Sequence, residues 1–193
     1  MRKRTATATV ISTAALFFSL AAPAGAQDIT VVNASHVAPA LLHHVETVVA
    51  RQVNVDLHRY WRHAAHIRFA DTAHAWRVTL VKLHIVCSKD VGCLPGLAGS
   101  YDHGWHDRWA HAEVGTDAGS GWEITLSHEV LEMAVDPYLR TFIPGTNMTI
   151  EICDSYEEFS YVRDGVGLSD FATPAFFGLG SARGRQDFLN LPV

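Results

Sequence analysis

The residues best suited to chemistry lie in one short stretch, which reads His-Glu-Val-Leu-Glu from His128 to Glu132. Residues four apart in an α-helix lie on the same face, one turn apart. His128 and Glu132 can therefore bind one metal ion, because zinc accepts imidazole nitrogen and carboxylate oxygen. Glu129 lies beside them and can act as the general base that takes a proton from a metal-bound water. The stretch predicts a hydrolytic metal site with His128 and Glu132 as ligands.

A catalytic zinc site uses a third protein ligand, and three downstream acids are candidates: Asp136, Glu151 and Asp154. On a straight helix, Asp136 lies about 12 Å along the axis beyond the first ligand, so it reaches the ion only if the helix breaks at Pro137. We expect residues 147–153 to form a strand, in which Glu151 and Asp154 face opposite sides. On this basis we favour Glu151 slightly over Asp136, which is alternatively a residue that holds one of the ligands in place.

Two other interpretations of these residues stay open. A chance match is one, because Glu is common in helices. The close framing of the helix by Gly121 and Pro137, and the acidic cluster downstream, argue against it. The other is a calcium site in addition to zinc, built from the hard oxygen ligands of Asp136, Glu151 and Asp154.

The first 26 residues predict a secretory signal peptide. Arg2, Lys3 and Arg4 precede an apolar run, and Ala24-Gly25-Ala26 provides a small-x-small cleavage signal, so we expect cleavage after Ala26. An uncleaved membrane anchor is the alternative, but the apolar run is short for a membrane span. We therefore expect a secreted or periplasmic protein with no stable membrane insertion after cleavage.

Residues 27–193 suit a single domain with a sizeable core. The formal net charge of the chain is -5, and no Lys/Arg cluster follows the signal segment, so nucleic-acid binding is disfavoured. The sequence carries no signal for an oligomeric state.

Three cysteines and twelve histidines are the other residues with metal or redox chemistry. Cys87 and Cys93 flank a short segment, and export permits disulfides, so we predict a disulfide between them. Cys153 is left over; we expect a buried free thiol, with an intermolecular partner as the alternative. Apart from His128, the histidines are scattered and form no tract, so we expect most to be surface or packing residues.

Apolar residues at helical spacing predict one long helix from Pro39 to about Tyr60, and the motif helix is expected over residues 122–135, ended by Pro137. Asp164-Gly165 is a two-residue hairpin turn. The predicted strands are 29–33, 66–69, 76–86, an edge strand within 94–104, 110–114, 147–153, 159–163 and 166–169. A change of apolar parity within 76–86 indicates a bulge or a strand buried on both faces. The aromatic residues after position 170 are expected to cover the core or line a cleft.

This order of elements resembles the layout of the zincin metallopeptidases: a backing helix, a mixed twisted sheet and an active-site helix beneath a cleft. Residues 29–33, 99–103, 125–137, 151–154 and 166–177 also resemble a bacterial and phage family of largely uncharacterised zinc-peptidase-like proteins. The resemblance covers nearly the whole of residues 27–193. It implies one α+β, zincin-like domain, zinc as cofactor, and functional positions at His128, Glu129, Glu132, Asp136, Glu151 and Asp154.

The expected function is an exported metal-dependent hydrolase, specifically a zinc metallopeptidase that acts on a peptide or protein substrate. Glu132 in place of a second His adds negative charge at the metal and makes it a weaker Lewis acid. The alternatives are a non-catalytic, metal-stabilised secreted binding domain and a histidine-rich metal-handling protein. Candidate donors to an oxyanion, which the sequence does not rank, are Tyr156, Tyr161, His103 and His106.

Overall fold

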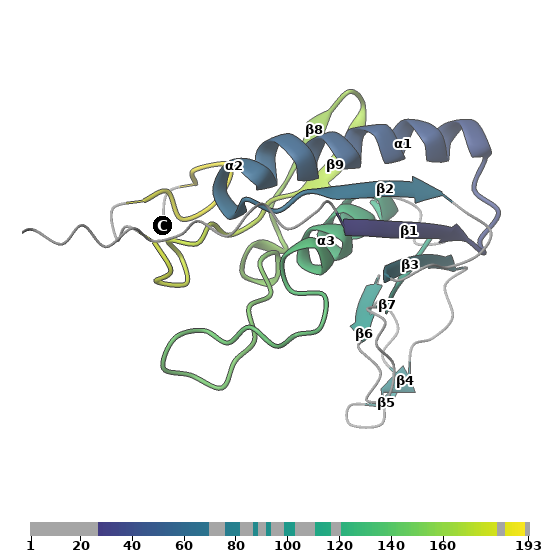
Figure 1. Ribbon diagram of the computed structural model, residues 1–193. Helices are drawn as coiled ribbons and strands as arrows, with labels where there is room; N and C mark the ends of the chain where they lie inside the picture. The colour runs from purple at the N-terminus through teal and green to yellow at the C-terminus, as the bar shows by residue number, and fades with distance from the viewer. Residues whose placement is uncertain are drawn as a thin grey trace, which may run out of the picture.

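The computed structural model describes residues 27–69, 76–81, 87–88, 92–93, 99–102, 111–116, 121–180 and 184–191 (Figure 1). The predicted signal segment and the second half of the predicted strand 76–86 lie outside these residues. The elements in chain order are β1 (Gln27–Asn33), α1 (Pro39–Arg51), the π-helical η1 (Gln52–Leu57), α2 (His58–Trp61), β2 (Ala65–Phe69), β3 (Trp76–Val81), β4 (Cys87–Ser88), β5 (Gly92–Cys93), β6 (Gly99–Asp102), β7 (His111–Gly115), α3 (Trp122–Val135), the 3-10 turn η2 (Asp154–Tyr156), β8 (Ser160–Arg163) and β9 (Val166–Ser169).

Five strands form one mixed sheet in the order β2-β1-β3-β7-β6. The first four are parallel, and β6 pairs antiparallel with β7 at one edge. Alternate residues bury one face: Ile29 is level with Ile67 and Trp76, Val78 is level with Ala112, and all five are buried. The opposite face carries mostly polar side chains, so the described part of β3 is buried on one face. The predicted change of parity lies outside the described residues.

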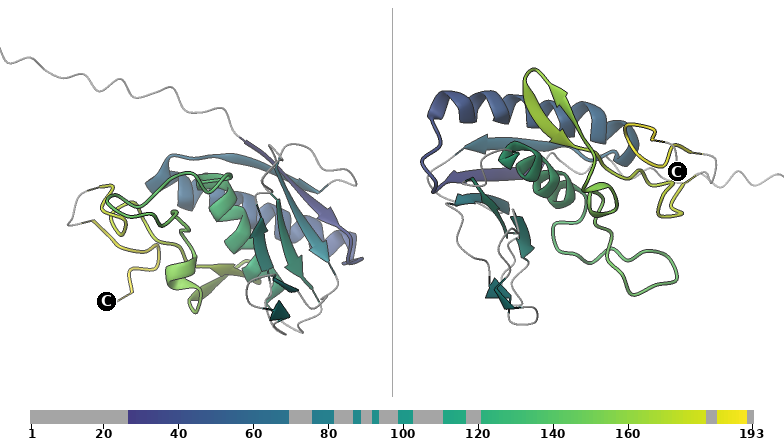
Figure 2. Two further views of the ribbon diagram at one scale, coloured as in Figure 1. Left: turned by 90° about the horizontal axis from the view of Figure 1, so that it is seen from below. Right: turned by 180° about the vertical axis from the view of Figure 1, so that it is seen from behind.

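Both long helices cover the buried face of the sheet. α1 packs along β2, α3 packs against β6, β7 and β3, and the two helices contact each other. Figure 2 shows α3 on the same side of the sheet as α1, with the β8–β9 hairpin beside it. Helices combined with a mixed sheet in this way agree with the predicted α+β class. Within the described residues, no helix has the length and apolar character needed to cross a membrane.

The predicted long helix is confirmed, since α1, η1 and α2 run on without a break. The π-helical geometry of η1 was not predicted, and two buried polar side chains of this segment bond to the β8–β9 hairpin. Gln52 donates to the Ser169 carbonyl oxygen at 2.9 Å. Asp56 pairs with Arg163 and accepts a hydrogen bond from the Tyr161 hydroxyl. The wider turn of a π-helix thus coincides with the place where the long helix is joined to the hairpin.

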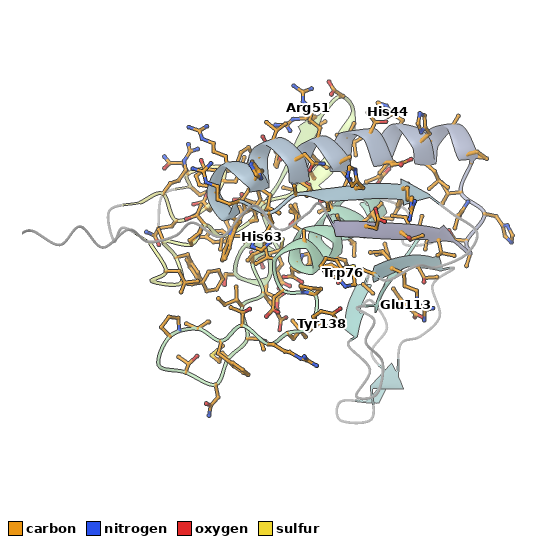
Figure 3. All side chains as sticks on the ribbon, viewed as in Figure 1. His44, Arg51, His63, Trp76, Glu113 and Tyr138 are labelled. Carbon is orange, nitrogen blue, oxygen red and sulfur yellow. The ribbon has the colours of Figure 1, made fainter. Side chains whose placement is uncertain are left out.

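The predicted β8–β9 hairpin is confirmed. Its turn residues, Asp164 and Gly165, have φ of 51° and 80°, the two positive values that a tight type I′ hairpin turn requires. The turn lies on α1, where Arg51 pairs with the Asp164 carboxylate at 3.5 Å (Figure 3). His44 Nε2 lies 2.8 Å from the Asp164 carbonyl oxygen, from the same side of the helix.

The predicted strand over residues 147–153 is wrong, because the segment has one isolated bridge and then turns into η2. Ile150 and Ile152 are both buried, and this alternation produced the strand-like pattern in the sequence. The backbone bonds of the segment go to several places: the Ile150 amide donates to the Thr141 carbonyl oxygen at 2.9 Å, and the Cys153 amide donates to Glu132 Oε1 of α3 at 3.1 Å.

The β4–β5 ribbon bears on the predicted disulfide, which stays a prediction. The two strands are antiparallel, with Cys87 directly opposite Cys93. Opposite residues of an antiparallel pair have Cα atoms about 4.5–5.5 Å apart, within the range that a disulfide spans. We expect alkylation of the denatured, unreduced protein to modify Cys153 alone, and alkylation after reduction to modify all three cysteines, as read by intact mass. Three modified cysteines without reductant would contradict the disulfide.

Gly167 lies where β9 approaches α3 most closely. A Cβ atom at this position would lie 2.8 Å from Cγ1 of Ile124. We expect Gly167→Ala to lower the free energy of unfolding by about 1–3 kcal/mol, the usual effect of overpacking, measured by urea denaturation. In an Ile124→Ala background the same substitution should cost less, because the clashing atoms are gone. An equal loss in both backgrounds would show that the close approach is not the cause.

Candidate metal centre

The motif helix is confirmed as α3, which begins after Gly121 and ends at Asp136. Gly121 has φ of 96°, a left-handed conformation that glycine adopts readily. Asp136 leaves helical geometry at φ -139°, as expected for a residue that precedes a proline. Two motif carboxylates face the interior: Glu129 is 5% exposed and Glu132 is 3% exposed. Buried carboxylates need partners or a bound ion.

Three side chains converge at one point beside α3. His128 Nε2 lies 3.4 Å from Glu132 Oε2 and 3.2 Å from Asp154 Oδ1. One ligand atom from each residue lies within 4.8 Å of the other two. One nitrogen and two carboxylate oxygens form a donor set that zinc accepts. The structure therefore brings together the two motif residues and one of the three downstream acids.

Both oxygens of Glu132 have a defined neighbour. Oε1 accepts the Cys153 amide at 3.1 Å, which leaves Oε2 to face His128. Cys153 is a buried free thiol, as predicted, and its Sγ lies 3.7 Å from the His128 carbonyl oxygen. Sequence reasoning missed the contribution of the Cys153 amide, because every non-proline residue carries such a donor and the sequence does not mark the ones that are used.

Asp154 and Glu151 form a carboxyl pair next to His128. The two carboxyl groups interact electrostatically, and Glu151 Oε1 accepts the Thr149 hydroxyl at 2.9 Å. The hydrogen bond to His128 lowers the pKa of Asp154. Burial and the Asp154 carboxyl raise the pKa of Glu151 to about 7. The converging group contains Asp154, whereas Glu151, the candidate favoured from the sequence, is not a member of it.

Asp136 has a different environment from the other acids. Its Oδ1 accepts the Arg140 amide at 3.0 Å and its Oδ2 accepts the Thr141 amide at 2.7 Å. These bonds hold the first turn of the loop that leads back to Glu151. The alternative calcium site would require Asp136, Glu151 and Asp154 to lie together. Among the described residues, these three acids do not form a group that could hold a metal ion.

Glu129 has a buried oxygen, Oε2, that lacks a hydrogen-bond partner among the described residues. Burial and the nearby charge of Glu132 raise the pKa of Glu129 to about 8. An unpartnered buried carboxylate oxygen is costly. A water molecule or a cation at the centre would satisfy it, so this atom supports the fit of a metal and its water to the site.

Two neighbouring carboxylates, Glu132 and Asp154, favour the positively charged form of His128. Burial opposes protonation, but hydrogen bonds to Asp154 and Glu132 outweigh it and raise the pKa of His128 to about 10. The carboxylates therefore favour a cation at this point. A divalent metal ion can take the place of the proton, because ligand groups release protons when they bind a metal.

The four candidate oxyanion donors lie in different places, and two of them fall outside the described residues. His103 and His106 lie outside the described residues. Tyr161 donates to Asp56 at 3.3 Å, on the side of the hairpin. Tyr156 belongs to the same 3-10 turn as Asp154, and its buried ring packs against neighbouring phenylalanines.

Comparisons with known proteins leave the site to be interpreted from its own geometry. A scan against family models, a search of curated proteins and a search of solved structures each gave no match.

The pKa of Glu129 predicts how stability depends on pH in the metal-free protein. The pKa rises from its ordinary value of 4.5 to about 8 on folding, so stability falls as pH increases through this interval. Glu129→Gln keeps the shape and removes the titration. Relative to wild type, we expect this variant to gain more than about 2 kcal/mol in free energy of unfolding between about pH 5 and pH 8, from urea denaturation in EDTA. The exposed Glu158→Gln serves as control, and a pH-independent difference for Glu129→Gln would contradict the prediction.

Proposed function

We propose that the protein is an exported zinc-dependent hydrolase with a zincin-like arrangement, and specifically a metallopeptidase. The observation that carries the proposal is the convergence of His128, Glu132 and Asp154. Glu129 follows His128 on the same helix and has a buried Oε2 that lacks a hydrogen-bond partner among the described residues. The fold supports it, because α1 corresponds to the expected backing helix, the five-stranded sheet to the mixed sheet, and α3 to the active-site helix.

His128, Glu132 and Asp154 are the proposed ligands. Imidazole and carboxylate groups are both common zinc ligands, and three protein ligands leave a position open for water or substrate. The two carboxylates also balance the charge of a divalent ion. This balance makes the metal a weaker Lewis acid than one held by two histidines and one carboxylate, so we expect slow turnover.

Glu129 is the proposed general base. A zinc ion at this centre would supply a Lewis acid that acidifies water and polarises a peptide carbonyl. Glu129 takes a proton from the attacking water at Oε2 while the water oxygen adds to the carbonyl carbon. It then delivers this proton to the amine nitrogen as the C–N bond breaks. Its burial raises its affinity for protons, which suits a base that works near neutral pH. Asp136 contributes by holding the loop and is not placed among the ligands.

Metal content and cleavage, measured together, test the proposal. We expect the wild-type protein to bind a single zinc ion per chain and to cleave casein. Glu129→Gln should keep zinc and lose at least about 100-fold in rate. Asp154→Ala should weaken zinc binding by more than about 100-fold. Asp136→Ala should keep zinc but lose about 1–3 kcal/mol of stability, because two amides lose their acceptor.

Each failure points to a different function. Zinc bound by wild type and Glu129→Gln, with cleavage by neither, would reject the hydrolase and favour a non-catalytic, metal-stabilised secreted domain. Many ions per chain would favour a metal-handling protein. Loss of zinc in Asp136→Ala, but not in Asp154→Ala, would overturn the proposed ligand set.

A further inference from the structure

A group of packed aromatic rings, two of them partly exposed, begins two residues after Asp154 in the chain. Tyr156 is buried, and its ring lies 6.4 Å from that of Phe159 and 5.5 Å from that of Phe176. Phe159 is 44% exposed and Phe176 is 41% exposed. We call these three residues the aromatic rim. Phe177 is buried, and its ring packs edge-to-face against that of Phe176, with 5.1 Å between the ring centroids.

The aromatic rim is continuous with the metal centre along the chain. Asp154 and Tyr156 belong to the same 3-10 turn, η2. The Phe159 amide donates to the Tyr156 carbonyl oxygen at 2.9 Å, so the backbone between these rings is fixed. The Phe176 amide likewise donates to the Thr173 carbonyl oxygen at 3.0 Å, so the backbone under both exposed rings is bonded before any ligand binds, which lowers the entropy lost on binding.

The charges along the segment that carries Tyr156 have one sign. Residues 151–158 contain four acidic residues and no Lys or Arg. Glu157 and Glu158 are exposed, and neither forms an ion pair with any described residue. Two basic side chains of the described C-terminal part have other partners: Arg163 pairs with Asp56, and Arg185 donates to the Tyr60 hydroxyl.

We propose that the aromatic rim, together with Glu157 and Glu158, binds a Lys or Arg side chain of an extended polypeptide. A cation over an aromatic face is attracted by the ring, and exposed carboxylates beside the ring complement its charge. Acidic and neutral polypeptides lack this complementarity. The surface would thus select basic segments and place the adjoining backbone at the metal centre, a role that rests on the proposed hydrolase.

Peptide binding tests the rim without requiring catalysis. The probes are fluorescein-labelled peptides of one sequence that carry Lys-Lys, Gln-Gln or Glu-Glu at the centre, and the protein is the Glu129→Gln chain, so that the probe stays intact. By fluorescence anisotropy we expect the Lys-Lys peptide to bind about 10-fold more tightly than the Gln-Gln peptide, and the Glu-Glu peptide to bind most weakly. This preference should shrink as salt is raised.

Matched variants locate the preference. Glu157→Gln with Glu158→Gln should reduce the advantage of the Lys-Lys peptide by about 3- to 10-fold. Phe176→Ala should reduce it by about 2- to 5-fold. The control, Asp28→Asn with Asp164→Asn, removes the same charge elsewhere on the surface and should leave the preference unchanged.

The outcomes separate this inference from the hydrolase. Equal affinity for the Lys-Lys and Gln-Gln peptides would overturn the proposed role of the rim. An equal loss of the Lys-Lys preference in the control variant would also overturn it. Casein cleavage without a preference for basic segments would reject the rim alone. Charge-dependent binding that is lost in the rim variants, in a protein that neither binds zinc nor cleaves casein, would support the rim and reject the hydrolase.

Discussion

The hydrogen bond from the Cys153 amide to Glu132 joins the two parts of the chain that build the candidate metal centre. Glu132 is almost completely buried, so each of its oxygens needs a neighbour. The amide satisfies one oxygen, and the other faces His128. Because Asp154 follows directly in the chain, the same bond places it within reach of His128. The bond therefore sets the register between the motif helix and the returning segment.

A second set of buried polar contacts holds α3 from its other side. Ser127, the neighbour of His128, donates to the Ile124 carbonyl oxygen and accepts the Ser169 amide at 2.7 Å. The Ser169 carbonyl oxygen accepts from Gln52 of η1. The end of β9 is thus bonded to both helical elements, through opposite sides of one residue. These bonds join β9 to α3 and to η1 through buried donors and acceptors, and so favour one arrangement of the three elements.

The parts of the fold with local signals were predictable, and those that depend on distant contacts were not. Gly121 and Pro137 mark the ends of α3 by their own backbone preferences. The choice between Glu151 and Asp154 depended on a strand that does not form, because the amide that a strand would have paired donates to Glu132.

Two further misses have the same physical origin. The π-helical geometry of η1 accompanies contacts to a hairpin more than 100 residues away in sequence, so the local apolar pattern cannot reveal it. The acid at the end of α3, Asp136, has the residue type of a ligand. Its carboxylate instead accepts the amides of Arg140 and Thr141, a use that the sequence permits without indicating.

The centre spans the boundary between core and surface, since the side chain of Asp154 is 52% exposed whereas that of Glu132 is 3% exposed. A substitution of Glu132 leaves the buried Cys153 amide without its acceptor and so lowers the free energy of unfolding of the domain. A change at Asp154 alters the converging group while the interior stays packed. In evolution, the chemistry of the proposed centre can therefore drift through its exposed member while the fold persists.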